Sequence, residues 1–153
     1  MEVFVSDPWF GLLAKPKQKI EEFLLLKNVD FKNAVIRRVG DGITYILKND
    51  NLSFLFIVNE EGMELLDSID FYRCRSLYFV DDIGDLPLPF NISKDDTGAS
   101  LVAKFGEPLQ KGGGFKEKIN IWLRWEFLQV EIDNKSWEQG KDAKWVSLTI
   151  FKG

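Results

Sequence analysis

The sequence predicts an α+β fold of two tandem units. Each unit has a helix, a long loop and an antiparallel sheet of three to four strands, with the helices packed on one face. Each half of the chain contains a helical pattern that is followed by alternating, strand-like segments. A proline-containing linker at 81–90 separates the units, which we place at 1–80 and 91–153. With 45% hydrophobic residues, the 153-residue chain can bury enough apolar surface for both units to form one compact domain.

The first unit begins with a helical pattern over residues 16–27, in which Ile20, Phe23 and Leu24 recur on one side. Pro16 suits the first turn of this helix because an N–H group is not needed there. Four strand-like segments follow, and turn residues separate the first three of them: 42–48, 52–59, 65–72 and 77–80.

The second unit opens with a helix that has a clear start and end. Ser93 and Asp96 have the spacing of a capping box, in which an acid at the third helical position also suits the helix dipole. An apolar stripe ends at Phe105, where Gly106 can take the left-handed terminal conformation and Pro108 prevents continuation. We therefore expect about three helical turns here.

The glycine-rich stretch Gly106–Lys118 raises the question of a phosphate-binding loop. Such a loop needs a Lys-Ser/Thr pair after its last glycine and a helix whose N–H groups point at the anion. Here Phe115 and Lys116 follow Gly114, and the next residues alternate like a strand. We therefore interpret Lys111–Lys118 as the loop that leads from the helix to the sheet.

The second sheet starts at residues 119–125, where apolar and polar side chains alternate. Ile121 and Trp125 share one face of this strand, and Trp122 and Arg124 share the other. Two further strands are predicted at 128–133 and 145–151. We assign Trp9 and Trp125 to the core.

Composition argues against several function classes. The net charge is −4, and the 20 basic and 24 acidic residues are spread evenly, so no basic block invites nucleic acid or an anionic membrane. The chain has no histidine, which removes the usual general base and the usual zinc ligand. We expect no catalytic residue, no metal and no cofactor, and therefore a protein that is not an enzyme.

The N-terminus and the cysteine count predict a cytoplasmic location. Glu2 stands where a signal peptide would carry basic residues, and no segment is long and apolar enough to span a membrane. Cys74 is the only cysteine, so no internal disulfide can form and a reducing compartment is expected.

The run GDLPLPFNISKDDTGASLVAKFGEPLQKGGG, the strand WLRWEF and the strand QVEID suggest a family. Together they resemble bacterial immunity proteins of contact-dependent and other polymorphic toxin systems, over about residues 84–152. The doubled helix-plus-sheet unit also resembles the architecture of the β-lactamase-inhibitor-protein class. The chain departs from the immunity pattern at Asn91, where a glycine is expected, and at Leu123, where an acid is common.

The polar side of the Trp/Arg strand is a candidate partner-binding site. Trp122 and Arg124 are expected to lie beside Glu126 and, across the hairpin, Glu131 or Gln129. Trp and Arg dominate interface hot spots because each buries a large area and keeps a polar or charged tip. In the alternative interpretation the helices cover this face, so that Trp122 belongs to the core and Arg124 is paired or snorkelling.

Two further sets of residues are contact candidates. Trp137 lies in a polar loop, where an aromatic side chain is less obliged to be buried. Asp81, Asp82 and Asp85 form an acidic linker that could face a basic partner and raise the association rate. A solvated turn is the plainer interpretation of these acids.

The resemblance implies a stoichiometric inhibitor that binds the C-terminal domain of a cognate toxin, such as a nuclease, with no turnover of its own. We expect no direct contact with nucleic acid or membrane. A non-catalytic adaptor of the same architecture is the alternative function. A small enzyme that uses carboxylates or lysine is a third class, which the missing histidine disfavours.

Overall fold

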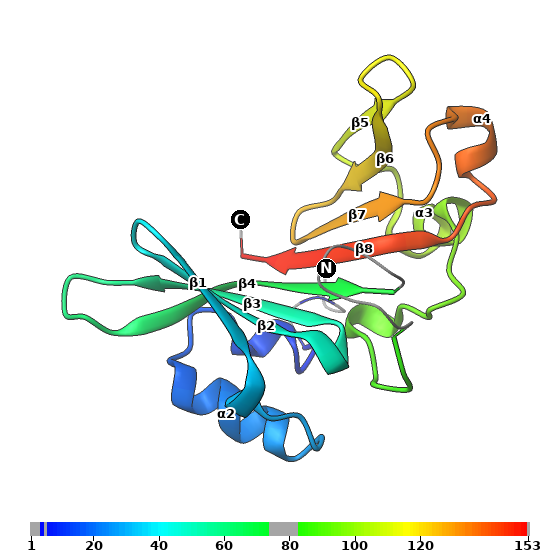
Figure 1. Ribbon diagram of the computed structural model, residues 1–153. Coiled ribbons are helices and arrows are strands. Elements are labelled where there is room, and N and C mark those ends of the chain that lie inside the picture. Colours follow the sequence, from blue (N-terminus) through cyan, green and yellow to red (C-terminus); the bar gives the residue numbers. More distant parts are fainter. Residues whose placement is uncertain (1–3, 5, 74–82, 153) are drawn as a thin grey trace.

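A computed structural model describes residues 4, 6–73 and 83–152, and every strand in those residues belongs to one antiparallel sheet (Figure 1). The eight strands of this sheet are β1 (Val35–Val39), β2 (Gly42–Leu47), β3 (Leu52–Val58), β4 (Glu64–Tyr72), β5 (Gln110–Gly114), β6 (Ile119–Arg124), β7 (Leu128–Ile132) and β8 (Trp145–Phe151). The strands predicted at 42–48, 52–59 and 65–72 and at 119–125, 128–133 and 145–151 are confirmed within a few residues. The strand predicted at 77–80 lies outside the described residues.

The prediction of two tandem units with separate sheets is wrong. The strand order is β1-β2-β3-β4-β8-β7-β6-β5, so the last strand of each half pairs with the other, from Ser68 opposite Phe151 to Tyr72 opposite Ser147. Alternation along the chain identifies strands but does not say which edges pair. Two separate sheets would have exposed the N–H and C=O groups of β4 and β8, and their pairing satisfies those groups.

The sheet is strongly bent, and its β5–β7 part rises away from the β1–β4 part (Figure 1). The helix α2 (Lys17–Leu25) packs under the β1–β4 part through its fully buried Ile20 and Leu24, which confirms the helix predicted at 16–27. The helices α3 (Gly98–Phe105) and α4 (Trp137–Gly140) lie at the other end of the sheet.

The core lies on a single side of the sheet, which we call the helix face. Ile20 of α2 and Leu101 of α3 belong to the same buried cluster as Phe54, Val130 and Leu148 of the sheet. Short 3₁₀ turns at Phe10–Leu12, Phe31–Asn33, Lys48–Asp50 and Pro89–Asn91 connect these elements. Trp9 and Trp125 are 2% and 4% exposed, so their assignment to the core is confirmed.

The sequence does not predict two of the strands, β1 and β5, because neither has an alternating apolar pattern. β1 contains two consecutive arginines, and its side chains are mostly exposed because it is an edge strand. β5 at the opposite edge has the sequence QKGGG and occupies part of Lys111–Lys118, which the sequence analysis interpreted as a loop. That interpretation is wrong at residues 111–114.

The glycines of β5 make room for two tryptophans. A Cβ at Gly112 would overlap the indole ring of Trp122, which lies against the backbone of its partner strand. Gly114 has a φ of +109°, and a Cβ there would come within 3.0 Å of the indole nitrogen of Trp137. The glycine run is therefore a bulged edge strand that seats one tryptophan at Gly112 and another at Gly114.

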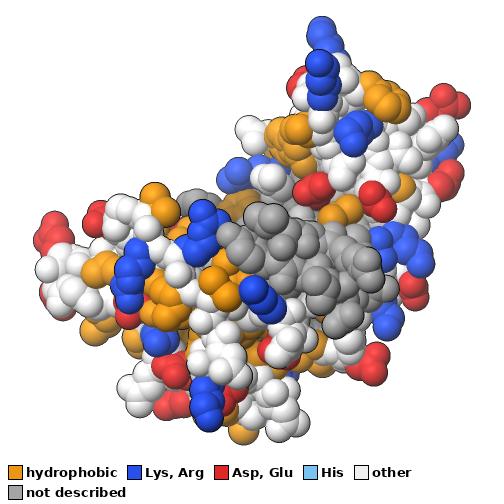
Figure 2. Space-filling view, viewed as in Figure 1, with side chains coloured by type: hydrophobic (Ala, Val, Ile, Leu, Met, Phe, Trp, Pro, Cys, Tyr) orange, Lys and Arg blue, Asp and Glu red, His pale blue; other side chains and the backbone are white. Residues whose placement is uncertain are grey.

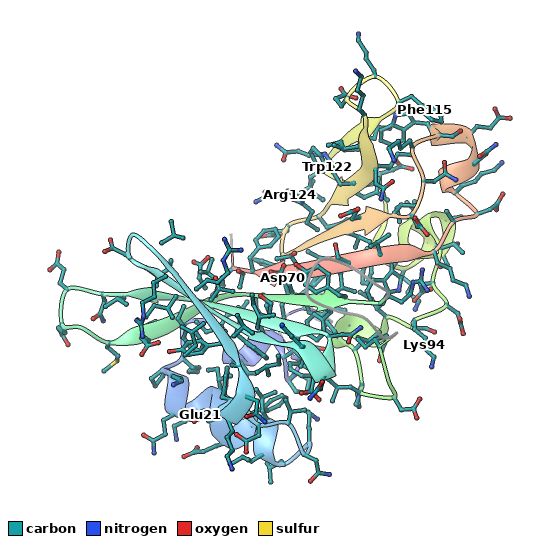
Figure 3. All side chains as sticks on the ribbon, viewed as in Figure 1. Glu21, Asp70, Lys94, Phe115, Trp122 and Arg124 are labelled. Carbon is teal, nitrogen blue, oxygen red and sulfur yellow. The ribbon has the colours of Figure 1, made fainter. Side chains whose placement is uncertain are left out.

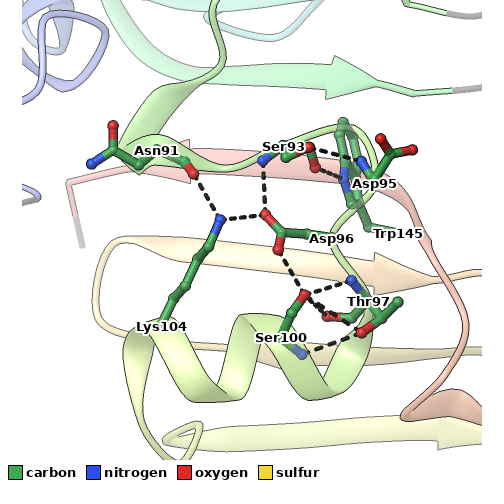
Figure 4. A network of polar contacts seen from close by, with 8 residues as sticks. All are labelled: Asn91, Ser93, Asp95, Asp96, Thr97, Ser100, Lys104 and Trp145. Atoms are coloured by element: carbon green, nitrogen blue, oxygen red, sulfur yellow. Dashed lines mark hydrogen bonds and ion pairs between the residues drawn. The ribbon is translucent and has the colours of Figure 1, made fainter.

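The helix α3 starts four residues later than the predicted capping box. Thr97 and Ser100 form the box: the Ser100 N–H donates to the Thr97 hydroxyl at 3.2 Å, and the Thr97 N–H donates to the Ser100 hydroxyl at 2.7 Å. Ser93 and Asp96 instead close a tight turn before the helix, where the Ser93 N–H donates to the Asp96 carboxylate at 2.7 Å (Figure 4). The pairs Ser93/Asp96 and Thr97/Ser100 have the same spacing in the sequence, and α3 begins at the second pair.

Asp96 is the centre of a polar network that ties this turn to α3 (Figure 4). Its carboxylate accepts hydrogen bonds from the Lys104 ammonium group and the Ser100 hydroxyl, both at 2.6 Å. Burial alone would raise the pKa of Asp96, but the hydrogen bonds from Lys104, Ser100 and Ser93 outweigh it and hold the pKa below its usual value.

No helix in the described part of the chain is long and apolar enough to cross a membrane.

Candidate protein-binding face

The side of the sheet opposite the helices presents mainly polar side chains along its centre, and we call it the polar face. Trp122 and Arg124 project from β6 on this side, with Asp70 below them on β4 (Figure 3). The members of the polar face on the neighbouring strands β6, β7, β8 and β4 are Asn120, Trp122, Arg124, Gln129, Glu131, Ser147, Thr149, Asp70 and Tyr72.

The register of the sheet brings these side chains into two rows that cross the strands. In one row Arg124 lies opposite Gln129, Gln129 opposite Thr149, and Thr149 opposite Asp70. In the other row Trp122 lies opposite Glu131, and Glu131 opposite Ser147. Side chains directly opposite each other on antiparallel strands are close neighbours, so each row is a continuous strip of contacts.

Two hollows occupy the polar face. One has a volume of about 410 Å³ and is lined by Trp122, Glu131 and Thr149 among others. The other, of about 330 Å³, is lined by Asp70, Tyr72 and residues of β1 to β3. The Thr149 hydroxyl of the first hollow donates a hydrogen bond to the Asp70 carboxylate of the second, so the two hollows adjoin.

Neighbouring side chains hold the aromatic and charged groups of the polar face in place. The Arg124 guanidinium lies 4.5 Å from the centre of the Phe151 ring, a cation–π geometry. The Asn120 amide donates to the Glu131 carboxylate at 2.8 Å. Trp122 is half-buried against Gly112. These side chains are thus partly ordered before any partner arrives, which lowers the entropy cost of binding.

Asp70 is a half-buried acid near the middle of the polar face. Burial raises the pKa of its carboxyl, and the hydrogen bond from Thr149 opposes that rise only in part. Burial also raises the pKa of Tyr72 to about 12, with further contributions from the negative charges of Asp70 and Glu131. The centre of the polar face is therefore a place where negative charge is unfavourable.

The structure brings together three of the predicted contact residues and separates the others. Trp122, Arg124 and Glu131 share the polar face, away from the helices, so the alternative in which helices cover Trp122 is wrong. Glu126 is exposed in the turn between β6 and β7.

Trp137 is 48% exposed and lies on the helix face, where it shares a pocket with Ile121 and Ile132. Asp85 is exposed and lies 3.7 Å from the Lys94 ammonium group. Lys94 is far from Trp122 and Arg124 in Figure 3. Asp81 and Asp82, like Cys74, lie outside the described residues.

Sequence reasoning missed Asp70, Tyr72 and Thr149 as parts of the same face as Arg124. All three occupy the polar phase of strands that were predicted correctly. The alternation of apolar and polar residues shows that each of these side chains lies on the polar side of its strand. It does not show which strands are neighbours, and only the β4–β8 pairing places these residues beside β7 and β6.

The outer end of the β5–β6 hairpin is a second exposed region, adjoining the polar face. Phe115 is 71% exposed and Ile119 is 51% exposed. Lys and Arg side chains gather at this end of the molecule beside hydrophobic ones (Figure 2). Ile119 also lines the larger hollow of the polar face, so the two regions are continuous.

Comparison with known proteins finds little that is similar to this chain. No protein-family model matches it, and no curated protein matches its sequence. One solved structure, a cysteine-rich secretory protein from Staphylococcus aureus, is similar over 94% of this chain, with a TM-score of 0.43 and 13% identity. The chain spans 45% of the length of that protein. The described residues contain no group of three or more His, Cys, Asp or Glu side chains arranged to hold a metal ion.

Proposed function

We propose that this chain is a binding protein that docks a protein partner on the polar face of its sheet. The observation that carries the proposal is the group formed by Trp122, Glu131 and Arg124 on two paired strands, beside two adjoining hollows and on the side that the helices leave uncovered. Trp and Arg are the side chains that most often dominate binding energy at protein interfaces. Their positions on a rigid sheet favour a partner recognised by shape.

The partner class in this proposal is a bacterial toxin domain. The basis is the resemblance of residues 84–152 to immunity proteins, which inhibit a toxin stoichiometrically. In this account the protein acts in the cytoplasm, forms a one-to-one complex and covers the active site or substrate surface of the toxin. Charged side chains of both signs on the polar face would select the cognate toxin and disfavour others.

Co-expression with the toxin domain encoded immediately upstream tests this proposal. We expect the chain to restore growth of cells that produce the toxin domain and to co-purify with it as a one-to-one complex. A toxin domain that still kills cells containing the folded, abundant chain would contradict the immunity function. An upstream product that is harmless but still forms the complex would favour the non-catalytic adaptor instead.

A further inference from the structure

An apolar pocket lies on the helix face, between α3, α4 and the β5–β7 part of the sheet. Its volume is about 350 Å³. Its walls are formed by apolar side chains from each of these elements and from the loop after α3: Val102, Pro108, Ile121, Leu123, Ile132 and Trp137. The pocket is separate from the polar face, because Ile121 and Leu123 point away from Trp122 and Arg124 on the same strand.

Close backbone contacts fix the shape of this pocket. A Cβ at Gly98, the first residue of α3, would lie 2.6 Å from the carbonyl oxygen of Gly140 at the end of α4. A Cβ at Gly140 would lie 3.0 Å from the side chain of Ile121. The two helices and β6 are therefore held at a spacing that larger residues would increase. Trp137 is seated beside Gly114 of β5, so the wall that it forms is also positioned by backbone.

Two lysines and one acid border the apolar walls. Lys111 comes from β5 and Lys141 follows α4, while Glu107 lies in the loop after α3. The Lys111 ammonium group lies 5.9 Å from the centre of the Trp137 ring. Neither lysine forms an ion pair with a carboxylate of the described residues. The charged side chains that line the pocket are thus two lysines and one glutamate, with a net charge of +1.

We propose that this pocket binds a small amphipathic anion, an aliphatic or aromatic chain that carries a carboxylate. Sites of this size usually take small molecules, and their walls are mostly apolar with a few polar groups that orient the ligand. The apolar chain packs against Ile121, Leu123 and Ile132, where it leaves water. The carboxylate remains at the border beside Lys111 and Lys141. This ligand site is independent of the proposed function of the polar face.

Calorimetric titration with three eight-carbon probes tests the proposal: octanoate, 1-octanol and octyltrimethylammonium. The probes share the chain and differ in the charge of the head group. We expect octanoate to bind most tightly and the cationic probe to bind most weakly. Because partly exposed charge pairs contribute about 0.2–1 kcal/mol, replacing one lysine by glutamine should weaken octanoate binding by about 1.4-fold to 5-fold.

Four variants and a matched control separate the contributions. Lys111→Gln and Lys141→Gln should weaken octanoate binding, and Glu107→Gln should strengthen it. The same three changes should act in the opposite direction on the cationic probe. Lys116→Gln removes an exposed lysine of the same hairpin that does not line the pocket, and it should leave both affinities unchanged. Ala99→Trp, on the exposed side of α3, should fill the pocket and abolish binding.

Circular dichroism confirms that each variant is folded before titration. Absence of octanoate binding to the wild-type chain at millimolar concentration would overturn the proposal. Equal effects of Lys116→Gln and Lys111→Gln would overturn the assignment of the carboxylate to the pocket border. The lysine and glutamate variants change exposed side chains, so the test does not depend on whether Ala99→Trp folds.

Discussion

Asp70 and Asp96 are two partly or fully buried acids whose surroundings shift their pKa values in opposite directions. Asp96 is 7% exposed, and a lysine and a hydroxyl donate to its carboxylate. Asp70 accepts a hydrogen bond from Thr149, and burial is the larger influence on its carboxyl. Ionised Asp96 therefore stabilises the fold, and ionised Asp70 destabilises it.

Replacing Asp96 by Asn should destabilise the protein at pH 7 by about 1–3 kcal/mol, because Lys104 and Ser93 lose a charged acceptor. The folded-state pKa of Asp96 lies below its unfolded value, so its contribution is fully present above about pH 5 and is lost as the pH falls below about 4. Urea unfolding of wild type and Asp96→Asn across this pH range measures the difference. A difference that stays constant from pH 7 to pH 3 would contradict this account.

Replacing Asp70 by Asn should leave the protein as stable as wild type at pH 7, or more stable. The folded-state pKa of Asp70 is raised, so ionisation costs stability above that pKa, and the cost disappears as the pH falls below the unfolded pKa of about 4. Any advantage of the variant should therefore shrink toward pH 4 in the same urea experiment.

The same substitution should also lower the pKa of Tyr72 from about 12, while burial keeps it above its usual value. Spectroscopic titration of the tyrosines measures that pKa, and an unchanged value would count against a charged Asp70.

At the scale of elements, the strand β5 depends on glycines that leave room for neighbouring side chains. Its glycines accommodate Trp122 and Trp137, and its register shifts between Gly112 and Gly114. Glycine is usually unfavourable inside a strand, so the sequence QKGGG does not indicate one. The helix α2 was predictable because its buried positions repeat at helical spacing. β5 was not, because its role is to make room for the side chains of other elements.

Replacing Gly112 by Ala should destabilise the protein by about 1–3 kcal/mol, because the added methyl group overlaps the Trp122 indole. Gly11→Ala is the matched control, since a Cβ at that exposed position meets no atom within 4 Å. The control should change stability by no more than about 0.5 kcal/mol. Urea unfolding measures both variants, and equal effects would contradict the packing of Trp122 on β5.

At the scale of the whole molecule, the pairing of β4 with β8 turns two strand groups into one sheet. The sequence predicted six of the eight strands and placed Trp122 and Arg124 on the same side of theirs, but it left open whether the helices cover that side. It did not predict the joined sheet, because the alternation within a strand does not indicate which distant strand pairs with it. For the same reason Asp70 and Thr149 could not be assigned to one site, although each was placed correctly on its own strand.

A single sheet with a shared core should unfold in one cooperative step. Four of the five tryptophans lie after residue 120, so fluorescence reports mainly on the second half, whereas circular dichroism reports on the whole chain. We expect the urea transitions measured by the two methods to coincide. A first transition seen only by circular dichroism would show that the halves unfold separately, against the β4–β8 junction.

The central claim is that the polar face, and not the helix face, binds the protein partner. The most direct measurement compares the affinity of the upstream toxin domain for wild type, Arg124→Glu and Trp137→Ala by calorimetry. Arg124 lies on the polar face, and Trp137 lies on the helix face. We predict a loss of at least about 10-fold for Arg124→Glu, which corresponds to about 1.4 kcal/mol, and no change for Trp137→Ala. Unchanged affinity of a folded Arg124→Glu variant together with weakened binding by Trp137→Ala would contradict the claim and place the partner on the helix face.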